Sequence, residues 1–191
     1  MAPRPLILLP ATAAILIGLL AGCVPTATAE STPPPSDAPS TPSTEPSEPA
    51  SPSATPIDVE CNALVSLDAM YAYNPNFGWV DDWQPETGSA AADAVALGGV
   101  ACQWVNQTSG DTIDLSVASL DEQALEALKN EAVEQSTMVP TYGEEAYFEV
   151  VDGVGTAIVF DRSYWLVVSS DYFFEPGDAT EIVEAALSAL P

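Results

Sequence analysis

The stretch AYFEVVDGVGTAIVFDRSYWLVVSS, residues 146–170, decides the fold of this 191-residue chain. Two apolar runs flank Asp152-Gly153, a dipeptide that favours a two-residue turn between the strands of a β-hairpin. A second turn at residues 161–163 leads into a third apolar run, which ends at Ser170. Because strands joined by such short turns are antiparallel, the stretch predicts a three-stranded antiparallel meander.

The segments before and after the meander supply two more strands and the helices. Apolar and polar residues alternate over 112–118, which predicts a strand, and 101–107 predicts its hairpin partner. Helical spacing of apolar residues predicts helices after Ser66, over 90–97, after a capping box at Ser119-Leu-Asp-Glu122, and after a cap at Asp178. The order predicts an α+β fold: an antiparallel sheet of about five strands covered by amphipathic helices.

The amino terminus predicts a bacterial lipoprotein. Residues 1–22 form a signal peptide with a short apolar stretch, and Leu20-Ala21-Gly22-Cys23 matches a lipobox, so Cys23 is the predicted lipid attachment site. The alternative is an ordinary secretory peptide with a chance cysteine. Two acyl chains on Cys23 would anchor the protein stably at the outer face of the cytoplasmic membrane, exposed to the cell wall or the extracellular space.

Residues 23–57 predict a disordered linker that starts at the lipidated cysteine. Of the 34 residues that follow Cys23, 10 are proline, 7 serine and 6 threonine. Such a segment buries too little apolar surface to offset the entropy of ordering. Fully extended, it would span about 100 Å at ~3.1 Å per residue. The globular domain is therefore assigned to residues 58–191.

Charge and cysteine content exclude several classes of function. The chain has 28 acidic residues, 3 basic residues and no histidine. Nucleic-acid binding needs basic side chains to displace counterions, and histidine-based catalysis or metal binding has no histidine to use. Once Cys23 is assigned to lipid, Cys61 and Cys102 remain as a pair in an oxidising compartment, which predicts a disulfide between them.

Together these features resemble a known family. The elements are the lipobox, the Pro/Ser/Thr-rich spacer, Cys61-Asn-Ala-Leu-Val-Ser66 entering a helix, a strand with Cys102-Gln-Trp104, and a final amphipathic helix. The chain is similar to the actinobacterial lipoproteins of domain-of-unknown-function family 3558. That resemblance implies a PsbP-like architecture, with an antiparallel sheet between helices. It implies no activity and no catalytic residues.

An aromatic stretch is the main candidate binding site. The candidate residues combine flat rings with carboxylates: Tyr73, Phe77, Trp79, Asp81, Asp82 and Trp83. Such groups could stack on and hydrogen-bond a sugar, or form the centre of a partner interface. The alternative is a long loop between residues 74 and 88 that its aromatic side chains pin to the core.

Other candidates are weaker. The carboxylate pairs Asp81-Asp82, Glu144-Glu145 and Asp111 with Asp114 could bind Ca²⁺ or act as an acid–base pair, but solvated surface is the alternative. Residues 171–176 could rim a cleft or pack on the end of the sheet. No catalytic residue, metal ligand or cofactor is predicted.

Three functions compete. The first is a non-enzymatic binding or adaptor module that contacts another protein of the cell envelope. The second is a carrier or sensor that holds a lipid or small molecule in a pocket between sheet and helices. The third is a hydrolase that uses carboxylates alone, which needs two acids about 5–9 Å apart in a cleft.

Overall fold

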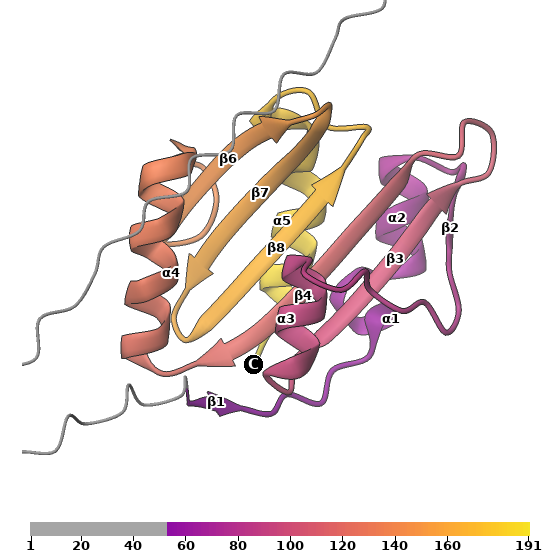
Figure 1. Cartoon of the computed structure of the whole chain (residues 1–191). Coiled ribbons are helices and arrows are strands. Elements are labelled where there is room, and N and C mark those ends of the chain that lie inside the picture. The colour runs from indigo at the N-terminus through magenta and orange to yellow at the C-terminus, as the bar shows by residue number, and fades with distance from the viewer. Residues whose placement is uncertain (1–52) are drawn as a thin grey trace, which may run out of the picture. The chain divides into compact units, whose positions relative to one another are not determined.

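The computed structural model describes residues 53–191 (Figure 1). The predicted signal peptide, Cys23 and most of the predicted linker lie outside these residues. The elements, in chain order, are β1 (Ala54–Thr55), α1 (Cys61–Leu64), α2 (Leu67–Tyr73), β2 (Phe77–Trp79), α3 (Ala90–Ala96), β3 (Val100–Asn106), β4 (Thr112–Leu120), α4 (Glu122–Gln135), β5 (Thr137–Met138), β6 (Glu145–Val151), β7 (Val154–Asp161), β8 (Tyr164–Ser170) and α5 (Pro176–Ala189).

The strands of this part form one open antiparallel sheet, so the predicted α+β class is confirmed. The order is β2-β3-β4-β8-β7-β6-β5, and β1 pairs with the end of β4. The sheet has eight strands where about five were predicted. The five long strands match the prediction, whereas β1, β2 and β5 have only two or three residues each. Segments this short show no alternating pattern, and pairing with a longer neighbour defines them.

Pairing between β4 and β8 joins the two halves of the sheet. The β3–β4 hairpin and the β6–β7–β8 meander are separate in sequence, and the register Ile113↔Ser170 to Ser119↔Tyr164 connects them. The meander itself turns as predicted, because Asp152 and Gly153 both have positive φ, at 52° and 88°. These are the left-handed conformations that a type I′ hairpin turn needs.

Helices cover both faces of the sheet. Helices α1, α2 and α5 pack on one face, over a core that contains Leu115, Leu166 and Ile182. Helices α3 and α4 lie on the other face, in front of the sheet in Figure 1, over a smaller core that contains Phe160 and Trp165. Side chains alternate between these faces along each strand, which is why β4 and β8 are buried on both sides.

Two of the predicted helix starts are corrected. Ser66 caps α2 as expected, since its hydroxyl accepts the Ala69 N–H at 3.1 Å. Ser119, however, is a buried residue of β4, and Asp121 is the cap of α4, accepting a backbone N–H at 2.8 Å. Helix α5 begins at Pro176, so Asp178 lies in its first turn. Strand pairing of Ser119 moves the start of α4 by two residues, and a capping box between Glu175 and Asp178 moves the start of α5 by three.

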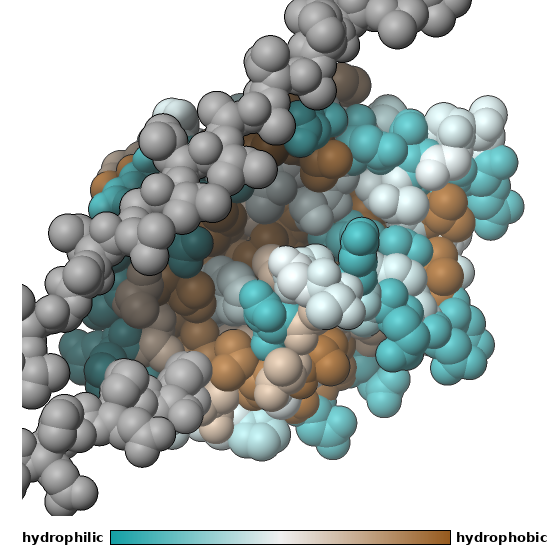
Figure 2. Space-filling model, in the orientation of Figure 1, coloured by the Kyte–Doolittle hydropathy of each residue, from teal (hydrophilic) through white to brown (hydrophobic). Residues whose placement is uncertain are grey.

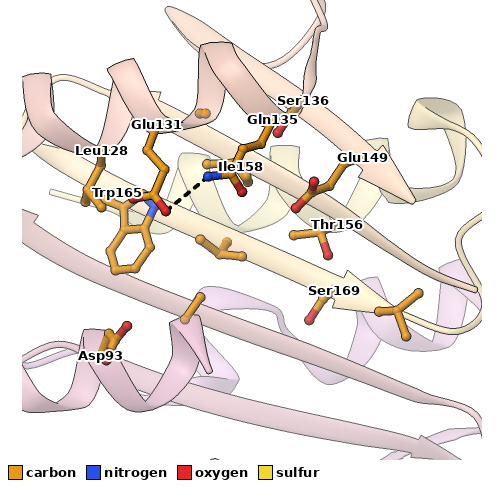
Figure 3. A pocket seen from close by; sticks show the side chains of 14 residues that line it. Asp93, Leu128, Glu131, Gln135, Ser136, Glu149, Thr156, Ile158, Trp165 and Ser169 are labelled. Atoms are coloured by element: carbon orange, nitrogen blue, oxygen red, sulfur yellow. Dashed lines mark hydrogen bonds between the residues drawn. The ribbon is translucent and has the colours of Figure 1, made fainter. Parts of the chain in front are cut away.

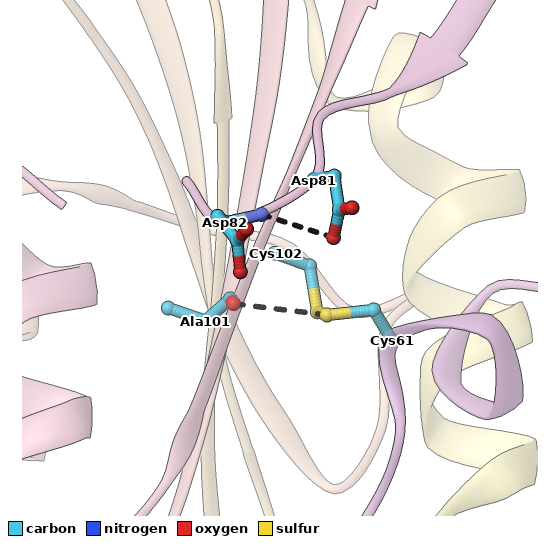
Figure 4. Close-up of a disulfide and its surroundings, with 5 residues drawn as sticks. All are labelled: Cys61, Asp81, Asp82, Ala101 and Cys102. Atoms are coloured by element: carbon cyan, nitrogen blue, oxygen red, sulfur yellow. Dashed lines mark hydrogen bonds between the residues drawn. A yellow bond between two sulfur atoms is a disulfide. The ribbon is translucent and has the colours of Figure 1, made fainter. Parts of the chain in front are cut away.

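The predicted disulfide between Cys61 and Cys102 is present, with the two Cα atoms 5.7 Å apart. It joins the start of α1 to β3 on the face that α5 covers (Figure 4). Ordered pairing also begins before residue 58, within the range predicted as linker. Ala54 and Thr55 pair with the end of β4, and the Ile57 N–H donates to the Gly98 carbonyl at 3.1 Å.

Candidate functional site

Two of the six predicted binding residues are part of the hydrophobic core. Phe77 is buried, and its ring lies with those of Tyr73 and Tyr172 in a cluster with centroid separations of 5.7–6.5 Å. The Tyr73 hydroxyl donates to the Asp178 backbone carbonyl at 3.2 Å. Burial, followed by the charges of nearby groups, raises the pKa of Tyr73 above its ordinary value. These two aromatic side chains pin the segment to α5, as the alternative interpretation expected.

The other four predicted residues lie at the edge of the sheet. Trp79 ends the edge strand β2 and is 43% exposed, and Trp83 is partly buried. Asp81 and Asp82 are exposed, and the Asp81 carboxylate accepts the Asp82 N–H at 3.1 Å (Figure 4). The six residues therefore divide between the core and an exposed edge. None of them lines the two cavities between α3 and α4.

The main concavity lies on the opposite face of the sheet, between α3 and α4. One cavity of about 380 Å³ lies over β7 and β8, and a second of about 570 Å³ lies between α3 and the start of α4. Asp93, Leu128 and Trp165 line both cavities. The two cavities therefore adjoin each other, and we call them together the α3–α4 groove. Figure 2 shows hydrophobic side chains in this hollow.

The strand register gives the groove a polar end. Glu149, Thr156 and Ser169 are direct cross-strand neighbours on β6, β7 and β8, and Ser169 is paired in turn with Asp114. Their side chains share one face of the sheet because directly paired residues point the same way. Figure 3 shows the first three along one end of the groove. Burial raises the pKa of Asp114, although its hydrogen bond from Gln103 opposes that rise.

The rest of the floor is apolar. Ile158 on β7 and Val167 on β8 are a directly paired couple, and each lies two residues from the polar row. Two residues further along β8 is Trp165, which is only 7% exposed and lines both cavities. Leu97 and Leu120 then line the far end. The floor thus changes from polar to apolar along the strand direction, whereas polar side chains, among them Asp121, also line the far end.

Helices α3 and α4 form the walls. Leu128, Glu131 and Gln135 project from α4, and the Gln135 amide donates to Glu131 at 3.3 Å (Figure 3). On α3 the residues nearest the sheet are alanines, with Asp93 at the mouth. Helix α3 contacts the sheet through alanines, whereas α4 contacts it through alanines and the larger Leu125 and Leu128, and the two cavities lie between the helices.

The charge around the groove is entirely negative. Four carboxylates line it and no lysine or arginine does: Asp93, Asp121, Glu131 and Glu149. The two cations of residues 53–191 are engaged elsewhere. Lys129 Nζ lies 3.2 Å from Glu145, and Arg162 Nε lies 3.0 Å from Asp161.

The predicted carboxylate pairs have structural partners. Glu145 accepts the Tyr147 hydroxyl at 2.6 Å, and this hydrogen bond, together with Lys129, lowers the pKa of Glu145. Asp111 accepts the Ser109 hydroxyl at 2.6 Å. Within residues 53–191 no three acidic, cysteine or histidine side chains are grouped as they would be to hold a metal ion. These carboxylates therefore form local hydrogen bonds and ion pairs, and they do not form a shared site.

The segment 171–176 divides in the same way as the aromatic stretch. Phe173 is fully buried, Tyr172 joins the ring cluster with Tyr73, and Phe174 is 75% exposed. The Asp171 carboxylate accepts the Thr112 N–H at 3.0 Å. The segment therefore mainly packs on the end of the sheet near α5, and this was the alternative to a cleft rim.

The groove residues were not predicted as a site, because they carry only a weak signal in the sequence. Glu149, Thr156 and Ser169 occupy outward positions in alternating strands, where polar side chains are ordinary. Only the strand order places them side by side, and only the spacing of α3 and α4 leaves them uncovered.

No family model, curated protein or solved structure matches the chain. In the part of the chain that the structure describes, no helix is long and apolar enough to cross a membrane.

Proposed function

We propose that this protein is a lipid-anchored, extracytoplasmic binding protein that holds a small ligand in the α3–α4 groove. The observation that carries the proposal is the groove itself: a hollow on the sheet with a hydrophobic floor around Trp165 and a polar row at one end. Its two cavities, about 380 and 570 Å³, fall in the ~300–1,000 Å³ range of small-molecule sites. Of the three functions considered above, this supports the carrier or sensor.

Binding, rather than catalysis, fits the side chains around the groove. The chain has no histidine, and the groove is lined by alkyl, indole, hydroxyl and carboxylate groups. A hydrophobic floor with a few placed polar groups is typical of a site that orients a ligand. The hydroxyls of Thr156 and Ser169 provide hydrogen bonds at one end, and Trp165 provides a flat apolar surface.

The anchoring half of the proposal rests on the amino-terminal sequence. The lipobox at 20–23 and the proline-rich segment after it would hold the domain outside the membrane at the end of a long arm. A Cys23→Ser substitution tests this. We expect the wild-type protein to fractionate with membranes and to incorporate labelled fatty acid, and the variant to lose the label. Membership of family 3558, with its PsbP-like architecture, likewise stays a prediction.

Blocking the groove tests the binding half. Ala127 is exposed and lines the larger cavity, so Ala127→Trp fills the cavity without replacing a core residue. Val133, 57% exposed on the same helix and absent from both cavity linings, supplies the control Val133→Trp. The full-length protein in phosphatidylcholine vesicles is titrated with neutral 4-phenylbutanol, and empty vesicles give the blank.

We expect the wild-type protein and Val133→Trp to bind this alcohol equally, and Ala127→Trp to lose binding. Equal binding by all three proteins would place the alcohol elsewhere and contradict the proposal. Equal urea midpoints for the two variants would show that the loss does not come from unfolding.

A second candidate, the envelope adaptor, is favoured by one observation. Trp79 is exposed at the edge strand β2, and Leu67 and Tyr71 project from the outer side of α2. Exposed aromatic side chains of this kind are common at interface centres. Crosslinking in the native membrane tests the adaptor: Trp79→Ala would remove a stoichiometric crosslinked partner that the wild-type protein retains.

A further inference from the structure

We propose that the ligand of the α3–α4 groove is a small organic cation, a protonated amine or quaternary ammonium that carries an apolar body. This inference rests on the proposed function of the groove and adds the chemical class of its ligand. Three observations carry it: the sign of the charge around the groove, the absence of ion-pair partners for its carboxylates within residues 53–191, and the order of polar and apolar residues along its floor.

The first observation is the one-sided charge. Asp93 stands at the mouth on α3, Asp121 and Glu131 lie on the α4 side, and Glu149 faces them from β6. Carboxylates that approach from three elements create a negative potential inside the hollow, and its low-dielectric walls focus that potential. An anionic ligand would be repelled, whereas a cation would be attracted, although Asp121 also accepts the Ala124 and Ser53 N–H groups.

The second observation is that these four carboxylates have no counter-ion within residues 53–191. The lysine and arginine of this range are held by other acids: Lys129 by Glu126 and Glu145, and Arg162 by Asp161. A ligand ammonium therefore displaces no internal ion pair when it enters.

The third observation is the order of groups along the floor. Glu149, Thr156 and Ser169 form the polar end, Ile158 and Val167 follow, and Trp165 lies beyond them. From Ser169 to Trp165 is four residues, or about 13 Å at ~3.3 Å per residue of strand. This order places the ammonium against Glu149 and the two hydroxyls, with the apolar body lying over the aliphatic side chains toward the indole of Trp165.

The size of the hollow selects a small molecule over a folded partner. The two cavities are of small-molecule size and lie between two helices that pack on the sheet. A molecule with one ring or short chain and one amine would span the row from Ser169 to Trp165. The occupant of the groove is therefore a free organic cation.

Three probes with the same skeleton test the charge preference: 4-phenylbutylammonium, 4-phenylbutanol and 4-phenylbutanoate. Each is titrated calorimetrically into the full-length protein in phosphatidylcholine vesicles, with empty vesicles as the blank. We expect the ammonium to bind about tenfold more tightly than the alcohol, because even one partly solvated carboxylate contributes an attraction of that order. The carboxylate probe should bind most weakly. Of the three probes, only the ammonium should bind more weakly when salt is added.

Two substitutions locate the charge effect. Glu149→Gln removes the carboxylate at the polar end. It should weaken the binding of the ammonium probe several-fold and leave the binding of the alcohol unchanged. Glu131→Gln, on the α4 wall, should also weaken the binding of the ammonium probe. Glu134→Gln is the matched control, since Glu134 lies on the same helix, is exposed and lines neither cavity.

The outcomes separate this inference from the proposed function. Equal affinity for the ammonium and the alcohol, or tighter binding of the carboxylate probe, would overturn the cation specificity while leaving a ligand-binding groove. An ammonium preference that Glu134→Gln reduces as much as Glu149→Gln would overturn it as well, because it would reflect overall charge. No binding of any probe would overturn both proposals.

Discussion

Removing the Cys61–Cys102 disulfide is the sharpest test of how the domain is stabilised. The bond connects residues 41 positions apart, and it ties α1 to β3, where Cys102 is 1% exposed. In the chain-entropy account, releasing a loop of this length costs the folded state about 4 kcal/mol at 25 °C. Small domains are stable by only ~5–15 kcal/mol, so this is a large part of the total.

The loss is measured by urea unfolding of the full-length protein in vesicles. All four tryptophans of the chain lie between residues 79 and 165, so their fluorescence reports this domain alone. Cys61→Ala/Cys102→Ala is compared with oxidised and reduced wild-type protein. The reduced protein keeps both sulfur atoms, so its loss measures the crosslink, and any additional loss in the double variant measures packing.

We expect the reduced protein to lose about 4 kcal/mol, and the double variant slightly more. A loss below about 1 kcal/mol in the reduced protein would refute the entropic argument, and two free thiols in the unreduced native protein would refute the bond itself. The disulfide lies on the face opposite the α3–α4 groove. Probe affinity in the absence of urea should therefore be the same for the folded double variant and the wild type.

Three further predictions concern local interactions. Asp121→Ala removes the cap of α4 and should cost about 1 kcal/mol of unfolding free energy in urea titrations, whereas Asp121→Asn should retain most of it; equal losses would contradict the capping role. Gly155→Ala should cost about 2 kcal/mol or more, because the new Cβ would lie 2.3 Å from the Phe173 carbonyl oxygen; an unchanged thermal midpoint would show that this contact relaxes freely. Tyr147→Phe removes the hydrogen bond that lowers the pKa of Glu145 below 4.5. A lowered pKa stabilises the fold fully above the ordinary pKa, and this stabilisation is lost as the pH falls through the lowered pKa. The variant should therefore be about 1 kcal/mol less stable than wild type at pH 7, and the two should converge as the pH falls below about 4.5; a constant difference across that range would contradict the assignment.

Much of the fold follows from local patterns. The β6–β7 hairpin needs two residues with positive φ, and Asp152-Gly153 provides them within the stretch itself. The long strands and helices follow from apolar periodicity over seven or more residues. Caps were less predictable: Ser119 and Asp121 are both good caps, and the sequence alone does not show that Ser119 is held in β4 by pairing with Tyr164.

The candidate site was the least predictable part. The aromatic stretch predicts a binding site because rings and carboxylates are adjacent there in sequence. In the structure, however, Phe77 and Tyr73 pack against Tyr172 and α5. Composition indicates that a residue can bind a ligand. It does not show whether that residue is buried in the hydrophobic core.

The sequence by itself determined the antiparallel meander, the helices, the disulfide pair and the strongly acidic character of the chain, because each of these depends on near neighbours or on simple counts. Only the tertiary structure decided that β8 lies between β4 and β7, which residues of three strands form one polar row, and that α3 and α4 leave a groove open above them. The physical reason is that strand order and helix spacing depend on contacts between residues far apart in the chain, and no local pattern records those contacts.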